Sequence, residues 1–173
     1  MDIIVEDTNI LIDLFNTGLI KYCQQMDIAF HTTDYVIKEI EAPEQRATIV
    51  RYLMNGWLIL DKFQGDDFVL LNETISDYEG KNNLSDADCS VMLLAERLNC
   101  RLLTADQKLA RQARVRGVEV NGFLWLTDRM VETGVVEASI MAHHLQIYKD
   151  TNPRAKEPET SDRIKQYKEC NEY

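Results

Sequence analysis

The chain has 173 residues, of which 45% are hydrophobic, and it carries 19 Lys and Arg against 29 Asp and Glu, a formal net charge of −10. This length fits one domain with a substantial hydrophobic core. The negative charge argues against passive binding of nucleic acid, which depends on cationic side chains that displace phosphate counterions. No apolar stretch approaches transmembrane length, and the first residues lack the features of a signal peptide. We therefore expect a cytoplasmic protein with no membrane attachment.

Apolar periodicity predicts strands that alternate with helices along the chain. The predicted strands are short apolar runs and cover residues 3–5, 28–31, 57–60, 100–103 and 118–120. The predicted helices cover residues 8–15, 19–22, 34–40, 43–54, 66–79, 84–98, 107–115, 123–131 and 137–147. A loop is expected over residues 80–83. This alternation indicates an α/β fold with a central parallel sheet of about five strands flanked by helices.

The C-terminal residues have a different composition. Residues 150–162 contain Pro153 and Pro158 among charged side chains, which predicts a mobile linker before a short helix over residues 163–169. We therefore expect a single domain over residues 1–148, followed by a charged linker and a short C-terminal helix over residues 149–173. The four cysteines form no CxxC pair, which predicts reduced thiols.

Four acidic residues stand beside predicted element boundaries. Asp7 and Asp106 lie within three residues of the ends of predicted strands, and Glu39 and Asp88 lie on predicted helices. In an open parallel sheet, ligands bind outside the carboxyl ends of the strands. Carboxylates that converge there repel one another unless cations share the site, and their hard oxygen atoms suit Mg²⁺ or Mn²⁺. The pattern favours metal-assisted phosphodiester chemistry.

Each acid also has a purely structural interpretation. Ser85 and Asp88 have the spacing of a capping box, and Asp106 stands at the start of a predicted helix, where an acid complements the helix dipole. Caps do not require acids at the carboxyl ends of two strands. The set of four therefore favours a functional site over four independent caps.

Four segments carry a resemblance to a known family, and they are residues 4–12, 36–40, 84–88 and 102–106. In this order they resemble the PIN-domain ribonucleases over roughly residues 1–125. The resemblance implies a PIN-like nuclease domain over residues 1–148 that uses Mg²⁺ or Mn²⁺ to cut RNA. Many bacterial members are toxins of toxin–antitoxin pairs, so an antitoxin protein is an expected partner beside the RNA substrate.

The resemblance also implies roles for individual residues. It places the catalytic and metal-binding function on Asp7, Glu39, Asp88 and Asp106. Asn9 matches a polar residue that supports the first acid, and Thr104 matches a hydroxyl just before the last acid. Asp86 competes with Asp88 for the third acidic position, and the distance to Leu94 and Ala95 favours Asp88, with Asp86 as an accessory residue.

Glu41 competes with Glu39 for the second acidic position. Residues two apart on a helix are about 200° apart around its axis, so both cannot face one pocket. Val36, Ile37 and Ile40 define the buried side of the predicted helix, and Glu39 lies at its edge. We therefore predict that Glu39 faces the site and that Glu41 faces solvent.

Basic residues gather near the last predicted acid. Lys108, Arg111 and Arg114 step by three along one predicted helix, which keeps them on one side of it. One interpretation is a solvated helix face with cations at its carboxyl end. The other is a rim that positions RNA phosphates beside the acidic site.

Two alternatives remain at this point. A phosphoacceptor receiver domain would use Glu6 and Asp7 to bind metal, Asp61 as the acceptor and Lys108 as the charge sensor. A catalytically idle PIN fold would act as a binding module, although idle copies usually lose some of the four acids. The sequence leaves open the RNA target, the number of metal ions and whether the protein forms a homodimer.

Overall fold

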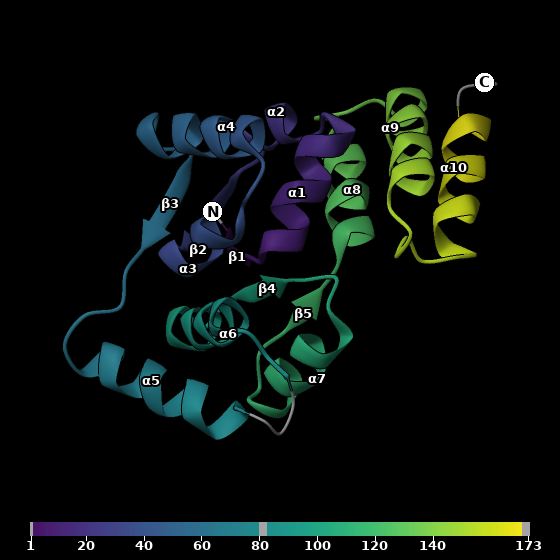
Figure 1. Cartoon of the computed structure of the whole chain (residues 1–173). Coiled ribbons are helices and arrows are strands. Elements are labelled where there is room, and N and C mark those ends of the chain that lie inside the picture. The colour runs from purple at the N-terminus through teal and green to yellow at the C-terminus, as the bar shows by residue number, and fades with distance from the viewer. Residues whose placement is uncertain (1, 80–82, 171–173) are drawn as a thin grey trace. The chain divides into compact units, whose positions relative to one another are not determined.

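The computed structural model describes residues 2–79 and 83–170. The described strands are β1 (Asp2–Glu6), β2 (Ile28–Thr33), β3 (Leu58–Asp61), β4 (Arg101–Leu103) and β5 (Val120–Asn121). They form one parallel sheet in the order β3-β2-β1-β4-β5 (Figure 1). This confirms the predicted α/β fold with a five-stranded parallel sheet. Of the loop predicted over residues 80–83, residues 80–82 lie outside the described part of the chain.

The described helices are α1 (Thr8–Thr17), α2 (Ile20–Cys23), α3 (Asp34–Glu39), α4 (Pro43–Met54), α5 (Asp66–Tyr78), α6 (Asp86–Leu98), α7 (Gln107–Val115), α8 (Phe123–Glu132), α9 (Ala138–Thr151) and α10 (Glu159–Glu169). The linker predicted over residues 150–162 is wrong in extent, because only residues 152–158 separate α9 from α10. Glu159 and Asp162 lie in the first turn of α10, where acids complement the helix dipole and favour helix initiation.

The chain divides into two compact units. Unit 1 comprises Met1–Ile10 and Asp27–Asn121 and contains the five strands that the structure describes. Unit 2 comprises Leu11–Met26 and Gly122–Tyr173. This structural division differs from the functional division expected at residue 148, which stays a prediction.

In unit 1, β1 lies at the centre of the sheet and pairs with both β2 and β4. Ile4 and Val5 on β1 are fully buried, as are Val91 and Leu94 on α6. Glu6 pairs with Leu103 on β4, and the ladder continues as the amide of Asp7 donates to the carbonyl of Leu103 at 3.1 Å. The carboxyl ends of β1 and β4 are therefore neighbours, as the sequence argument requires.

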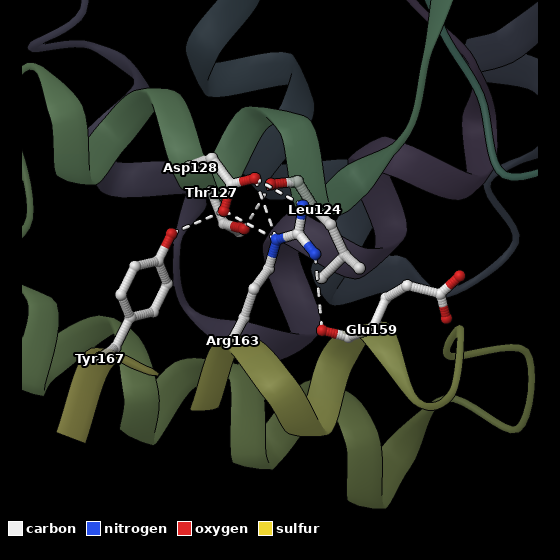
Figure 2. A network of polar contacts seen from close by, with 6 residues as sticks. All are labelled: Leu124, Thr127, Asp128, Glu159, Arg163 and Tyr167. Carbon is white, nitrogen blue, oxygen red and sulfur yellow. Dashed lines mark hydrogen bonds and ion pairs between the residues drawn. The ribbon is translucent and has the colours of Figure 1, made fainter. Parts of the chain in front are cut away.

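In unit 2, α10 is attached to α8 by a polar network (Figure 2). Arg163 on α10 donates from Nε and Nη2 to the carboxylate of Asp128 on α8, at 2.8 Å from Nε to Oδ1 and 2.8 Å from Nη2 to Oδ2. Tyr167, one turn further along α10, donates its hydroxyl to Asp128 Oδ1 at 2.6 Å. The i,i+4 spacing places both side chains on the same face of the helix. The C-terminal helix is therefore a packed part of unit 2.

Within residues 2–79 and 83–170, no helix is long and apolar enough to cross a membrane. Cys23, Cys89, Cys100 and Cys170 form no disulfide with one another in the part of the chain that the structure describes.

Candidate active site

Asp7 is the most buried of the four predicted acids. It directly follows β1 and is only 1% exposed. Its Oδ1 accepts from the amide of Thr8 at 2.7 Å, and its Oδ2 accepts from Thr104 Oγ1 at 2.8 Å and from Asn9 Nδ2 at 3.4 Å. The structure therefore brings Asn9 and Thr104, both expected as accessory residues, into contact with the first acid.

The surroundings of Asp7 perturb its ionisation. Burial, followed by the negative charge of Asp88, raises the pKa of Asp7 to about 7, against the lowering effect of its hydrogen bonds from Thr104, Thr8 and Asn9. A carboxyl group with this pKa is only partly charged near neutral pH. A bound cation would stabilise the charged form, so the position is suited to a metal ligand.

Glu39 is the last residue of α3 and reaches the same region. Its Oε2 accepts from the hydroxyl of Thr8 at 2.8 Å. Glu41 lies two residues beyond the end of α3 and is exposed. Thr8 was not among the expected site residues, although it stands between Asp7 and Asn9 in the segment that carries the family resemblance. Its position in that segment was the available signal.

Asp88 combines two roles. Its Oδ2 accepts from the amide of Ser85 at 2.8 Å, and its own amide donates to Ser85 Oγ at 3.1 Å, which forms the predicted capping box at the start of α6. Burial raises the pKa of Asp88, as do the charges of Asp106 and Glu39, while its bonds with Ser85 lower it. Asp88 is therefore a helix cap that also faces other acids of the set. Asp86, on the same turn, is exposed.

Asp106 caps α7. Its Oδ1 accepts from the amides of Lys108 and Leu109 at 2.7 and 2.9 Å. Its own amide donates to Thr104 Oγ1 at 3.0 Å, while that hydroxyl donates to Asp7. One threonine hydroxyl therefore joins the two acids at the strand ends.

A buried hydroxyl pair connects the two helices that carry Glu39 and Asp88. Thr33 Oγ1 and Ser90 Oγ are 2.7 Å apart, and both side chains are fully buried. Ser90 Oγ also donates to the carbonyl of Ala87 at 2.7 Å, so Thr33 is the donor to Ser90. The pair fixes the start of α3 against α6.

The donor set fits a hydrated hard cation. In the described part of the chain, no three His, Cys, Asp or Glu side chains lie close enough to form a ready-made metal cage. Asp88 nevertheless interacts electrostatically with each of the other three acids, Asp7, Glu39 and Asp106. Mg²⁺ keeps several water molecules and needs only one or two carboxylates, so this looser arrangement suits it better than a closed zinc-type site.

The basic residues of β4, of α7 and of the turn after α7 fall into two groups. Lys108, Arg111 and Arg114 are exposed on α7, and none of them forms an ion pair with another residue that the structure describes. Lys108 lies nearest the acids, because its amide donates to Asp106. These three side chains are available to an external anion.

Two other arginines are neutralised within the fold. Arg101 forms an ion pair with Glu119, and Arg116 forms one with Glu96. Both arginines line a cavity of about 520 Å³ together with residues at the start of β1. That cavity lies at the amino ends of the strands, the opposite edge of the sheet from the four acids.

The receiver-domain alternative is contradicted. Its sheet has the order β2-β1-β3-β4-β5, whereas this sheet has β3-β2-β1-β4-β5. Glu6 is fully buried, and in the part of the chain that the structure describes neither of its carboxylate oxygens has a hydrogen-bond partner. Burial raises the pKa of Glu6 to about 8. Asp61 is held by His31 at 2.6 Å and by Arg97 at 3.2 Å.

The comparisons identify the family. The family model described as PIN domain matches residues 3–169, so the chain belongs to the PIN domain family, whose members are typically nucleases and generally use divalent metals. The match includes the C-terminal helix and extends well beyond the roughly 125 residues over which the sequence resemblance was seen. No match is found among curated protein sequences.

Solved structures with a similar fold have low sequence identity. A PilT N-terminus domain protein, SSO1118 from Sulfolobus solfataricus, is 13% identical, with 75% of this chain and 94% of that chain covered and a TM-score of 0.47. VapBC2 from Rickettsia felis, bound to a DNA fragment from the promoter, is 14% identical, with 69% and 98% covered and a TM-score of 0.48. FitAcB from Neisseria gonorrhoeae is 12% identical, with 68% and 95% covered and a TM-score of 0.40.

Proposed function

We propose that this protein is a metal-dependent endoribonuclease that hydrolyses RNA phosphodiester bonds. The observation that carries the proposal is the connection between the acids. Asp7 is joined to Asp106 through the hydroxyl of Thr104, and its pKa is raised by burial and by Asp88. Helix capping explains Asp88 and Asp106 individually, but it does not explain the burial of Asp7 beside the charge of Asp88, which a bound cation would stabilise.

The acids have distinct tasks in this proposal. Mg²⁺ or Mn²⁺ held by Asp7, Glu39, Asp88 and Asp106 would lower the pKa of a bound water molecule and stabilise negative charge on the scissile phosphate. Asp7 and Asp106 are the rigid members, because backbone amides and Thr104 fix their carboxylates. Asn9 assists in orienting Asp7, and Asp86 remains an accessory residue on the rim.

We propose that α7 positions the RNA. Lys108, Arg111 and Arg114 are exposed and begin beside Asp106. Contacts to phosphate position a nucleic acid without reading its sequence. In a chain with a net charge of −10, such a local cationic surface is needed to hold RNA at all.

A narrower form of the proposal is that the enzyme is the toxin of a toxin–antitoxin pair, acts on cytoplasmic RNA and is restrained by an antitoxin protein. The competing candidate is an idle PIN fold that only binds a partner. The presence of all four acids favours the enzyme.

The test is incubation of the purified protein with Mn²⁺ and a varied set of single-stranded RNAs, with a parallel reaction in EDTA. We expect metal-dependent fragments. RNAs that remain intact in both reactions would reject the proposed activity.

A further inference from the structure

Helix α5 presents an apolar face that the described chain does not cover. Phe68, Val69 and Leu70 are 45%, 55% and 44% exposed. The next residue, Leu71, is fully buried, as is Thr74 at 4% exposure, so α5 already has an inward face. The three residues Phe68, Val69 and Leu70 are therefore only about half covered by the described chain and leave apolar surface exposed. Figure 1 shows α5 beside α6 within unit 1.

A groove of about 470 Å³ lies along this exposed face. Its lining residues are Phe68, Val69, Asn72, Glu73, Ser76 and Asp77. Phe68 and Val69 form an apolar wall at the amino-terminal part of the groove, and two carboxylates follow along the helix. A molecule that fills the groove must therefore offer an apolar group and, one to two helical turns away, positive charge.

The charges on α5 strengthen this requirement. The first turn of α5 contains Asp66 and Asp67, and its last turn contains no basic residue. Asp67 pairs with Arg97, but Glu73 and Asp77 form no ion pair with any residue in the described ranges. Asp77 also lies near the carboxyl end of the helix, where negative charge opposes the helix dipole. A cation near Asp77 would offset both the unpaired negative charge of the acids and the unfavourable interaction of Asp77 with the helix dipole.

We propose that this groove binds a basic amphipathic helix of a partner protein. An apolar side chain of the partner would contact Phe68 and Val69, and its Lys or Arg residues would face Glu73 and Asp77. RNA and anionic membranes are repelled by the same acids. A second copy of this chain in a symmetric contact would oppose identical acidic surfaces.

The test uses the full chain and two labelled synthetic peptides. Both are amphipathic helices with the same leucine positions, one with lysine and one with glutamate on the polar face. Fluorescence anisotropy should detect binding of the lysine peptide and no binding of the glutamate peptide. Failure of the lysine peptide to bind would overturn the proposal.

Matched variants separate the groove from the general acidity of the protein. The double variant Glu73→Gln with Asp77→Asn should bind the lysine peptide at least tenfold more weakly. The control pair Glu44→Gln with Asp162→Asn, both exposed acids outside α5, changes the net charge equally and should retain affinity. Equal weakening by both pairs would mean non-specific attraction and would overturn the proposal.

The apolar wall has its own control. Phe68→Ser with Val69→Ser should also weaken binding of the lysine peptide at least tenfold, whereas Met54→Ser, at a side chain that is 84% exposed on α4, should not. Sedimentation of the protein without peptide tests whether a second copy of the chain occupies the groove instead. A dimer that dissociates in the Phe68→Ser with Val69→Ser variant would assign the face to self-association and overturn the proposal.

Discussion

Replacement of Asp7 by Asn should stabilise the metal-free protein while it removes metal binding. Asp7 is 1% exposed and faces the charge of Asp88. A buried acid whose pKa is raised destabilises the fold once it ionises. Asn has nearly the same shape, its carbonyl oxygen can accept from the amide of Thr8, and the hydroxyl of Thr104 can rotate to accept from its amide.

The expected magnitude follows from the pKa of Asp7. Each pKa unit is worth about 1.4 kcal/mol, so the difference between the ordinary value of 3.8 and about 7 sets an upper limit of about 4 kcal/mol. Because the folded-state pKa is raised, the stability that Asp7 contributes is full below about pH 4 and is lost as pH rises to about 7. After a cost of about 1–2 kcal/mol for rearranged hydrogen bonds, we expect Asp7→Asn to gain about 2 kcal/mol at pH 8.

Urea unfolding in EDTA at pH 5 and pH 8 measures this effect. The free energy of unfolding of Asp7→Asn minus that of the wild type should be larger at pH 8. The pKa of Glu6 is also raised, to about 8, but this carboxyl group is present in both proteins and cancels in the difference. Glu41→Gln controls for the loss of an exposed acid. A lower stability of Asp7→Asn at pH 8 would refute the electrostatic argument and indicate a structural role for the carboxylate.

Three further predictions concern the rest of the site. Glu39→Gln should slow RNA cleavage at least about tenfold, about 1.4 kcal/mol of barrier, whereas Glu41→Gln should have little effect; the reverse pattern in single-turnover assays would show that the second acid is Glu41. Arg111→Ala with Arg114→Ala should weaken RNA binding and flatten its salt dependence without a change in metal affinity. Unaltered RNA binding at low salt would support the alternative that these residues form only a solvated helix face. Mn²⁺ at a hundred times its dissociation constant should raise the free energy of unfolding by about 2.7 kcal/mol, and calorimetry that detects no binding at millimolar metal would contradict the metal site.

Local patterns in the sequence were sufficient to predict most elements. The helix over residues 107–115 was predicted with both ends correct, because Asp106 caps it and its apolar residues repeat at helical spacing. The fifth strand was displaced, from residues 118–120 to Val120–Asn121. A two-residue strand is specified by its pairing with β4, which apolar content alone does not reveal.

Long-range contacts account for what the sequence did not predict at the site. The sequence predicted the four acids as site residues because each of them lies near the end of a predicted strand or helix. The bond from Thr8 to Glu39 and the pair formed by Thr33 and Ser90 join residues 31 and 57 positions apart. No local spacing encodes these pairings, although the position of Thr8 between Asp7 and Asn9 was a signal for that residue alone.

The most direct test of the central claim is the rate of Mn²⁺-dependent RNA cleavage in wild type, Asp7→Asn, Asp106→Asn and the double variant. Residues that act as one unit give strongly non-additive losses. We predict that each single substitution reduces the rate to the metal-free background and that the double variant is no slower. Small losses that add in the double variant, or a wild type without metal-dependent cleavage, would contradict the assignment of these acids to one catalytic site.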